Sequence, residues 1–310
     1  MKREKVTMKD IADKLGLSLA TVSYVMNHSE KEKISHDTRI KVLETAKSMG
    51  YVPNQTAKSL ASRRSNLVGI IVNLNNQASS NLKYQYLDLA AELEQELYLS
   101  GYDSILSVAY DLENIEMKYK HSLEAVFMID INEKSLRKVT GKYYVPVIFL
   151  ECDFDEGLFY KILPDYKTAI NQAKVLLQEE SPYLVMENVT NKTLKEAITD
   201  YFAKEDIYIH HKDTELKDFL NAKKNRKGII IGDLLGSKVE RYVDNSEIAV
   251  ISSNQDTDIL MADTRRIIIS NGQKAKAAVE VLKKLITLEY DANGHTRILL
   301  QPEGYGNSVR

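Results

Sequence analysis

Apolar residues near the start of the chain recur every three or four positions, in three short runs. The first run follows Thr7, a residue type that caps helices, with the carboxylate of Asp10 three positions later. The second run begins after Ser18 and reaches about Asn27, and the third begins after Ser35. The pattern therefore predicts three helices within the first fifty residues.

The first two of these helices have the spacing of a helix-turn-helix. Ala12 is a small residue where the helices cross, Gly16 can adopt the positive φ of a tight turn, and Val22 is a branched apolar wedge. The exposed side of the second helix carries short or adaptable groups, which suit a DNA major groove. We expect its hydroxyls to meet phosphates and its other side chains to meet base edges. These candidates are Ser18, Leu19, Ala20, Thr21, Ser23 and Tyr24.

Beyond Asn66 the pattern changes to short apolar runs of the strand type, separated by stretches with helical spacing. This alternation predicts parallel sheets joined by crossover helices. A break near Phe154–Leu163, ahead of a helix at Lys167–Gln178, divides the runs into two groups. The expected strands are Leu67–Val72, Ser104–Val108, Ala125–Ile131, Val145–Leu150, Tyr183–Met186, Ile207–His210, Gly228–Gly232 and Ile248–Ser252.

Charge is distributed unevenly along the 310 residues, although the formal net charge is only −2. Residues 1–66 carry 13 Lys and Arg against 7 Asp and Glu, whereas the remainder carries 29 against 37. A basic head on an acidic body is typical of a nucleic-acid-binding module joined to a domain that does not bind nucleic acid. No apolar run approaches the ~18 residues of a membrane span, and no apolar segment follows Met1–Lys5. We therefore expect a cytoplasmic protein without a membrane partner.

The sequence offers little support for an enzyme. No glycine-rich nucleotide motif occurs, and the nearest approach, Gly232–Lys238, has the wrong spacing for a phosphate cradle. No Ser-His-Asp or Cys-His arrangement is suggested. Cys152 is the only cysteine, which excludes an internal disulfide and a cysteine-rich zinc site, and we interpret it as a buried small residue. We expect no catalytic residue, cofactor or metal.

Three segments together resemble the LacI/GalR family of repressors. They are MKDIADKLGLSLATVSYVMN (Met8–Asn27), TRIKVLETAKSMGYVPNQTAKSLAS (Thr38–Ser62) and LVGIIV (Leu67–Val72), which match the family's head, hinge and first sheet strand in order and spacing. The resemblance implies an all-α helix-turn-helix head and a bilobed, periplasmic-binding-protein-like α/β body made of two parallel-sheet, Rossmann-like subdomains. It also implies a homodimer that binds double-stranded operator DNA and represses transcription.

In that family the segment equivalent to Asn54–Ser62 is a hinge helix, which pairs with its copy in the dimer and inserts a leucine into the minor groove. By position that leucine is Leu60, and Ala57 faces the partner helix. A short, mostly polar helix is marginal in water, so we expect it to form only on DNA. The DNA-binding candidates outside the recognition helix are Thr7, Asn27, Tyr51, Asn54, Ala57, Lys58, Leu60 and Ala61.

Two departures from the family affect the expected DNA contacts. The loop His28–Lys33 is longer than the family's usual turn. Tyr24 occupies a position that is often an arginine or histidine in relatives, and tyrosine cannot make arginine's bidentate contact with guanine. The operator sequence of a relative therefore cannot be transferred to this chain.

The resemblance and the strand pattern together predict three segments. Residues 1–52 form the helix-turn-helix domain, 53–66 the hinge helix and linker, and 67–310 the effector-binding and dimerisation domain. Within the last segment we expect lobe one at about 67–160 and 296–310, and lobe two at about 161–295.

In such a fold an effector binds between the lobes, where the carboxyl ends of strands and the helix N-termini meet. The residues expected there are Asn73, Glu151, Lys192 and Asn254, each of which could instead belong to a solvated loop. Asp233 is interpreted mainly as a helix cap. The expected effector is a small molecule such as a sugar, a sugar phosphate or a nucleoside. The polar residues that hold a sugar in many relatives are largely replaced, which favours the alternative of a body without an effector.

Two alternatives stay open. The body could lack an effector and serve for dimerisation or protein docking, which thermal-shift screening would reveal. The chain could instead be an enzyme or solute-binding protein with an incidental head, in which case residues 1–66 could be removed without loss of activity.

Overall fold

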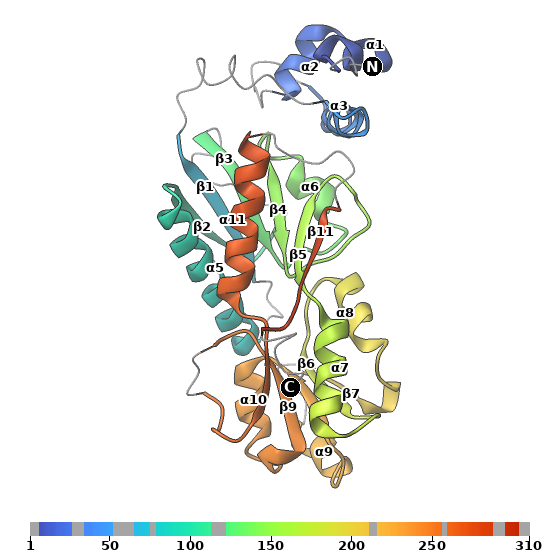
Figure 1. The fold of residues 1–310 in the computed structure, drawn as a ribbon, viewed down its shortest axis with the longest axis vertical. Helices are drawn as coiled ribbons and strands as arrows, with labels where there is room; N and C mark the ends of the chain where they lie inside the picture. Colours follow the sequence, from blue (N-terminus) through green and yellow to red (C-terminus); the bar gives the residue numbers. More distant parts are fainter. Residues whose placement is uncertain are drawn as a thin grey trace, which may run out of the picture.

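The computed structural model of this chain describes residues 6–26, 34–51, 65–74, 79–112, 122–210, 216–255, 259–287 and 295–303. The molecule is elongated, with a small helical head at one end and two α/β lobes below it (Figure 1). The upper lobe lies next to the head, and the lower lobe forms the far end. Within the described residues, no helix is long and apolar enough to cross a bilayer.

Three helices form the head, and the expected caps are present. The Thr7 hydroxyl accepts a hydrogen bond from the Asp10 amide, and the Asp10 carboxylate accepts one from the Thr7 amide, which completes a capping box. The Ser35 hydroxyl accepts from the Thr38 amide. The helices are α1 (Met8–Leu15), α2 (Leu19–Met26) and α3 (His36–Ser48).

The turn between α1 and α2 has the predicted geometry. Gly16 ends α1 with a φ of 64°, a left-handed conformation that glycine adopts without a Cβ clash. Ala12 and Val22 are both buried where the two helices meet. One apolar cluster joins all three helices, made of Ile11, Ala12, Val22, Val25, Met26, Val42, Ala46 and Tyr51. The head therefore has a small core of its own.

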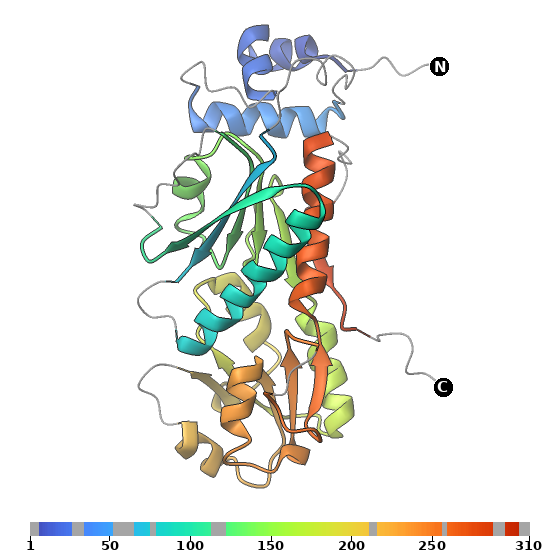
Figure 2. The ribbon, with the colours of Figure 1, turned by 90° about the vertical axis from the view of Figure 1, so that its left-hand side faces the viewer.

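The upper lobe is built on a six-stranded parallel sheet. Its strands are β1 (Leu67–Asn73), β2 (Asp103–Ala109), β3 (Leu123–Ile129), β4 (Val147–Leu150), β5 (Tyr160–Pro164) and β11 (Arg297–Leu300). They lie in the order β11-β5-β4-β3-β1-β2. Helices α5 (Ser80–Leu99) and α11 (Asn271–Thr287) pack side by side on one face (Figure 2), and the short α6 (Leu136–Thr140) covers the other.

The lower lobe contains a five-stranded parallel sheet with helices on both faces. Its strands are β6 (Tyr183–Glu187), β7 (Ile207–His210), β8 (Gly228–Ile231), β9 (Ile248–Ser252) and β10 (Arg265–Ile268), in the order β10-β9-β8-β6-β7. Helices α7 (Tyr166–Leu177) and α8 (Lys192–Thr199) share one apolar cluster with the sheet. Helices α9 (Leu216–Ala222) and α10 (Asp233–Val239) share another on the opposite face.

The predicted bilobed parallel α/β architecture is confirmed, but the sequence pattern did not predict three of the strands. Strand β5 lies largely within Phe154–Leu163, where we expected a break, and β10 and β11 have no counterpart among the expected strands. Strands β10 and β11 are sheet edges that carry arginines, so their apolar runs are short.

The lobe boundaries also differ from the expected ones. We expected residues 161–295 in lobe two, yet β5 extends the upper sheet to Pro164, and α11 shares the upper core with α5. The chain passes between the lobes after β5, before α11 and after β11. The Glu303 amide donates to the Ile268 carbonyl at 2.7 Å, so the last described residues lie against the lower lobe.

Candidate nucleic-acid interface and inter-lobe site

The side of α2 that points away from the head core carries the residues expected to meet DNA bases. Val22, Val25 and Met26 are buried, which leaves the opposite side of the helix accessible. Leu19 is 52% exposed and Ala20 is exposed, while Thr21, Ser23 and Tyr24 are half-buried. Figure 2 shows α3 next to the upper lobe and the other two head helices farther out.

Ser18 and Thr21 organise the N-terminus of α2. Ser18 Oγ accepts a hydrogen bond from the Thr21 amide at 3.0 Å and lies 2.8 Å from Thr21 Oγ1. Two hydroxyls are thereby fixed beside the first helical turn, where the helix dipole favours an anion. A DNA phosphate is the anion that a recognition helix meets in this orientation.

The remaining head candidates differ in accessibility. Thr7 is exposed, and its hydroxyl also donates to Asp10 Oδ2 at 2.7 Å within the capping box. The Tyr51 ring is buried in the head core, and this burial raises the pKa of its hydroxyl. The other expected DNA contacts, Asn27, Asn54, Ala57, Lys58, Leu60 and Ala61, lie outside the described residues.

Two of the residues expected to bind an effector are engaged by the protein itself. Asn73 ends β1 and is buried, and its Nδ2 donates to the Asp130 carbonyl at 2.7 Å. Glu151 follows β4 and forms an ion pair with Lys274 of α11, with 2.6 Å between the carboxylate oxygen and Nζ. Both members of this pair are buried, and a buried carboxylate requires such a partner.

Asp130 joins the two lobes from the end of β3. Its Oδ1 accepts hydrogen bonds from the Thr190 hydroxyl at 2.7 Å and the Thr190 amide at 3.2 Å. Burial raises the pKa of Asp130 to about 7, although the hydrogen bonds from Thr190 act in the opposite direction. The chain therefore holds a carboxyl that titrates near neutrality at the contact between the lobes.

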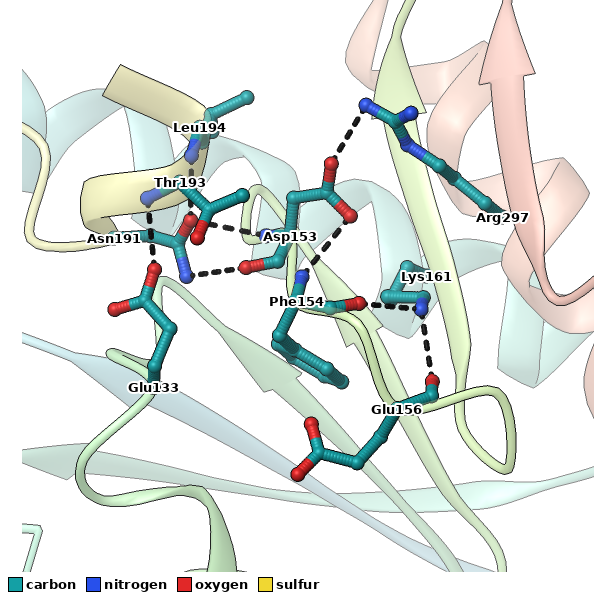
Figure 3. A network of polar contacts seen from close by, with 9 residues as sticks. All are labelled: Glu133, Asp153, Phe154, Glu156, Lys161, Asn191, Thr193, Leu194 and Arg297. Atoms are coloured by element: carbon teal, nitrogen blue, oxygen red, sulfur yellow. Dashed lines mark hydrogen bonds and ion pairs between the residues drawn. The ribbon is translucent and has the colours of Figure 1, made fainter. Parts of the chain in front are cut away.

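Asn191 makes a second connection between the lobes, as Figure 3 shows. Its Nδ2 donates to the carbonyls of Asp153 and Ile131, each at 3.0 Å. Its Oδ1 accepts from the amides of Asp153 at 3.1 Å and Leu194 at 2.8 Å. One side chain of the lower lobe thus caps α8 and ties it to the upper lobe.

Glu187 completes the contact between the lobes and borders an open cavity. It ends β6, and its carboxylate accepts from Ser79 Oγ and Asn81 Nδ2 at the start of α5, both at 2.7 Å. The cavity beside it measures about 440 Å³ and lies between α5 and α10. Its lining is Asn81, Tyr84, Gln85, Asp88, Glu187, Gly232, Asp233, Leu234, Leu235, Ser253, Asn254 and Ile259.

Of the four expected effector residues, only Asn254 lines this cavity. Lys192 is the first residue of α8, its side chain is 78% exposed, and it pairs with Glu196 at 3.3 Å. Lys192 is not among the residues that line the cavity, and its role in effector binding stays a prediction. The sequence pattern did not predict Glu187 as a site residue. Like Asn73, Glu187 is the last residue of its strand.

The interpretation of Asp233 as a helix cap is also wrong. Asp233 is the first residue of α10, and Gly232 occupies the cap position with no side-chain hydrogen bond. The Asp233 carboxylate instead accepts from Ser252 Oγ at 2.5 Å and from the Ser253 amide at 3.1 Å. It fixes the loop after β9 at the wall of the cavity. Within the described residues, no group of three or more His, Cys, Asp or Glu side chains could hold a metal ion.

Comparisons with known sequences find one matching family, at the head of the chain, and several relatives. The family described as bacterial regulatory proteins, lacI family, matches residues 7–54. The probable HTH-type transcriptional repressor ExuR of Bacillus subtilis is 29% identical over 178 residues, which is 54% of this chain and 50% of ExuR. Catabolite control protein A of Staphylococcus epidermidis is 25% identical over 288 residues, 87% of this chain and 83% of that protein. The match to ExuR spans only half of that relative's length.

Comparisons with solved structures give the same fold. The transcriptional regulator CelR in complex with cellobiose has a TM-score of 0.59 at 17% identity, with 96% of this chain and 98% of that chain covered. The lac repressor dimer bound to operator and the anti-inducer ONPF has a TM-score of 0.56 at 16% identity, with 96% and 97% covered.

The fold and the two sites define a helix-turn-helix protein whose body is a bilobed, periplasmic-binding-protein-like domain. The similarity to each of these two structures extends over 96% of this chain. Residues 7–54 match the LacI family of bacterial regulatory proteins, and the chain as a whole has the fold of the solved regulators.

Proposed function

We propose that this chain is a homodimeric transcription repressor that binds a pseudo-palindromic operator through α2. The observation that carries the proposal is the exposed and capped face of α2, in a head that the LacI family matches over residues 7–54. The excess of basic residues in 1–66 supports attraction to the phosphate backbone. Relatives named as repressors include ExuR and the sucrose operon repressor of Klebsiella pneumoniae.

In the proposed complex, the α2 helices of two protomers occupy successive major grooves of one duplex. The paired hinge segments, with Ala57 against its copy and Leu60 as the wedge, enter the minor groove between them. Effector binding then changes the lobe geometry, the spacing of the hinges and the affinity for the operator.

Exposed apolar side chains on the upper lobe support the proposed dimer. They lie at the end of α5 and on the edge strand β2 and its end, and comprise Tyr98, Leu99, Leu106 and Tyr110. An edge strand flanked by large exposed apolar residues is typical of a surface that pairs with another chain.

A carboxylate placed on the exposed face of α2 tests the DNA-binding proposal. Ala20→Glu should weaken operator binding at least about tenfold, because the new charge faces the phosphates and base edges. Ser48→Glu is the matched control, since Ser48 is also exposed on a head helix but lies at the end of α3. Operator affinity is measured by fluorescence anisotropy, and equal loss in both variants would contradict a role for α2.

We further propose that the cavity between α5 and α10 binds a neutral, hydroxyl-rich effector. Its described lining carries the carboxylates of Asp88, Glu187 and Asp233 and several amides, and contains no lysine or arginine. Such a lining suits a sugar or nucleoside and disfavours a sugar phosphate. Cellobiose, the ligand in the CelR complex, is a neutral, hydroxyl-rich molecule bound to a protein of the same fold.

Thermal-shift screening tests this effector class. A true effector raises the melting temperature through mass action, and Asn254→Ala should abolish the rise without lowering the melting temperature of the free protein. Sugars or nucleosides should raise the melting temperature, and their phosphates should not. The competing function, a body without an effector, is favoured by the engagement of Asn73, Asp130 and Glu151 within the protein, and the absence of any response would support it.

A further inference from the structure

The head meets the upper lobe through α3, at a seam far from the cavity between the lobes (Figure 2). Lys47 Nζ donates to the Gly157 carbonyl at 2.8 Å. The Arg39 guanidinium lies 3.9 Å from the centre of the Tyr144 ring, an arrangement typical of a cation–π contact. The head is therefore docked on the lobe by contacts of basic side chains.

A second cavity lies within this seam and is mostly apolar. The head contributes side chains from α2 and α3, and the lobe contributes the segments after α6 and before β5, together with Leu285 of α11. Four aromatic rings, those of Tyr143, Tyr144, Phe159 and Tyr160, line the lobe side. Pockets at domain boundaries with apolar walls and a few polar groups commonly bind small molecules.

The charged side chains that line this seam cavity are all basic. Its described lining includes His36, Arg39 and Lys47 and contains no aspartate or glutamate. Burial is the largest of the causes that lower the pKa of His36, so Arg39 and Lys47 supply the positive charge at neutral pH. An anionic group is the complement of this lining.

We propose that the seam cavity binds a small aromatic carboxylate, with its ring among the aromatic side chains and its carboxylate toward Arg39 and Lys47. The cavity measures about 130 Å³, and an apolar cavity of roughly 150 Å³ holds one benzene molecule. The seam cavity is slightly smaller than that, so a single ring is the largest group that it can enclose. Because such a ligand touches both the head and the lobe, it stabilises the docked head.

The experiment uses a tryptophan as a local reporter, because the chain has no tryptophan of its own. Phe159→Trp places the reporter in the seam cavity, with Tyr144→Trp as a second reporter. Tyr201→Trp in the lower lobe is the control. Benzoate is the probe, and benzyl alcohol and benzylamine are ligands of equal size with no charge and positive charge.

We expect benzoate to change the fluorescence of the seam reporters in a saturable manner and to leave the Tyr201→Trp signal unchanged. Benzyl alcohol and benzylamine should bind about tenfold more weakly, as should benzoate to a reporter carrying Lys47→Gln. Lys41→Gln removes an exposed lysine of α3 outside the cavity and should leave the affinity unchanged. No saturable response, equal binding of the alcohol, or equal effects of the two lysine variants would each overturn the proposal.

Discussion

Asp130 shows how one buried carboxyl couples the lobes to pH. Burial raises its pKa from the ordinary 3.8 to about 7, with Thr190 opposing the shift and Glu151 adding to it. Burial lowers the pKa of the nearby Lys195, and the charge of Asp130 opposes that shift. Between pH 3.8 and about pH 7, Asp130 keeps its proton in the folded chain but has lost it in the unfolded chain. By linkage, this carboxyl makes folding less favourable as the pH rises from about 4 to about 7.

Asp130→Asn should therefore remove a pH dependence. Asparagine stays neutral, so the variant should not lose stability in this way as the pH rises. The difference in unfolding free energy, variant minus wild type, should increase by about 1–3 kcal/mol from about pH 5 to about pH 8. Urea denaturation at the two pH values measures the difference. Asp13→Asn, at an exposed position on α1, is the control and should show no such gain. A difference that is independent of pH would contradict burial of an ionisable Asp130.

The sequence identifies residues whose partners are close along the chain, but not those whose partners are distant. The caps of α1 and α3 and the turn at Gly16 depend on neighbours within four positions, and all were predicted. Glu151 was expected to face a ligand because it follows a strand. The pattern cannot show that Lys274, more than a hundred positions later, already neutralises it.

Strand β5 illustrates the same limit at the scale of an element. Lys161 is the second residue of β5, and its charge interrupts the apolar run that would mark a buried strand. In the structure the side chain is buried, and its Nζ donates to the carbonyls of Phe154 at 2.7 Å and Glu156 at 2.9 Å. These partners satisfy the charge, so a strand forms where the pattern indicated a break.

Strand β8 provides a test of packing within an element. A Cβ added to Gly228 would lie 2.1 Å from the Tyr183 ring on the neighbouring strand β6. Gly228→Ala should therefore destabilise the protein by about 1–3 kcal/mol, as overpacking of a core does. A Cβ at Gly157 meets nothing within 4 Å, so Gly157→Ala is the matched control and should be nearly neutral. Chemical denaturation compares the two, and equal stabilities would show that the Tyr183 ring moves aside without cost.

At the scale of the whole molecule, the alternation of strands and helices predicts two parallel sheets, but not which lobe receives α11. That helix follows lower-lobe strands in sequence and packs on α5 because the chain returns to the upper lobe before it. The assignment depends on contacts between segments some 180 positions apart, such as Asn271 with Asp88. No periodicity within the helix carries this information.

The proposed dimer is tested on the exposed edge of the upper sheet. Leu106 lies in β2 and is 50% exposed, and Leu106→Glu should convert the dimer to a monomer, because it places two like charges in the paired surface. Val175→Glu, at a 76% exposed position of α7 in the lower lobe, should leave the dimer intact. Sedimentation velocity reports the association state. A Leu106→Glu protein that remains dimeric would place the interface elsewhere.

The return of the chain to the upper lobe has a consequence for protein synthesis. As the polypeptide leaves the ribosome, β1 to β5 emerge well before α11 and β11. While the lower lobe is translated, the β5 edge of the upper sheet lacks β11, and the face that carries α5 lacks α11. The head and the lower lobe can each complete their contacts during that interval. The nascent upper lobe therefore exposes an unpaired strand edge and apolar surface, the features that make a folding intermediate prone to aggregation.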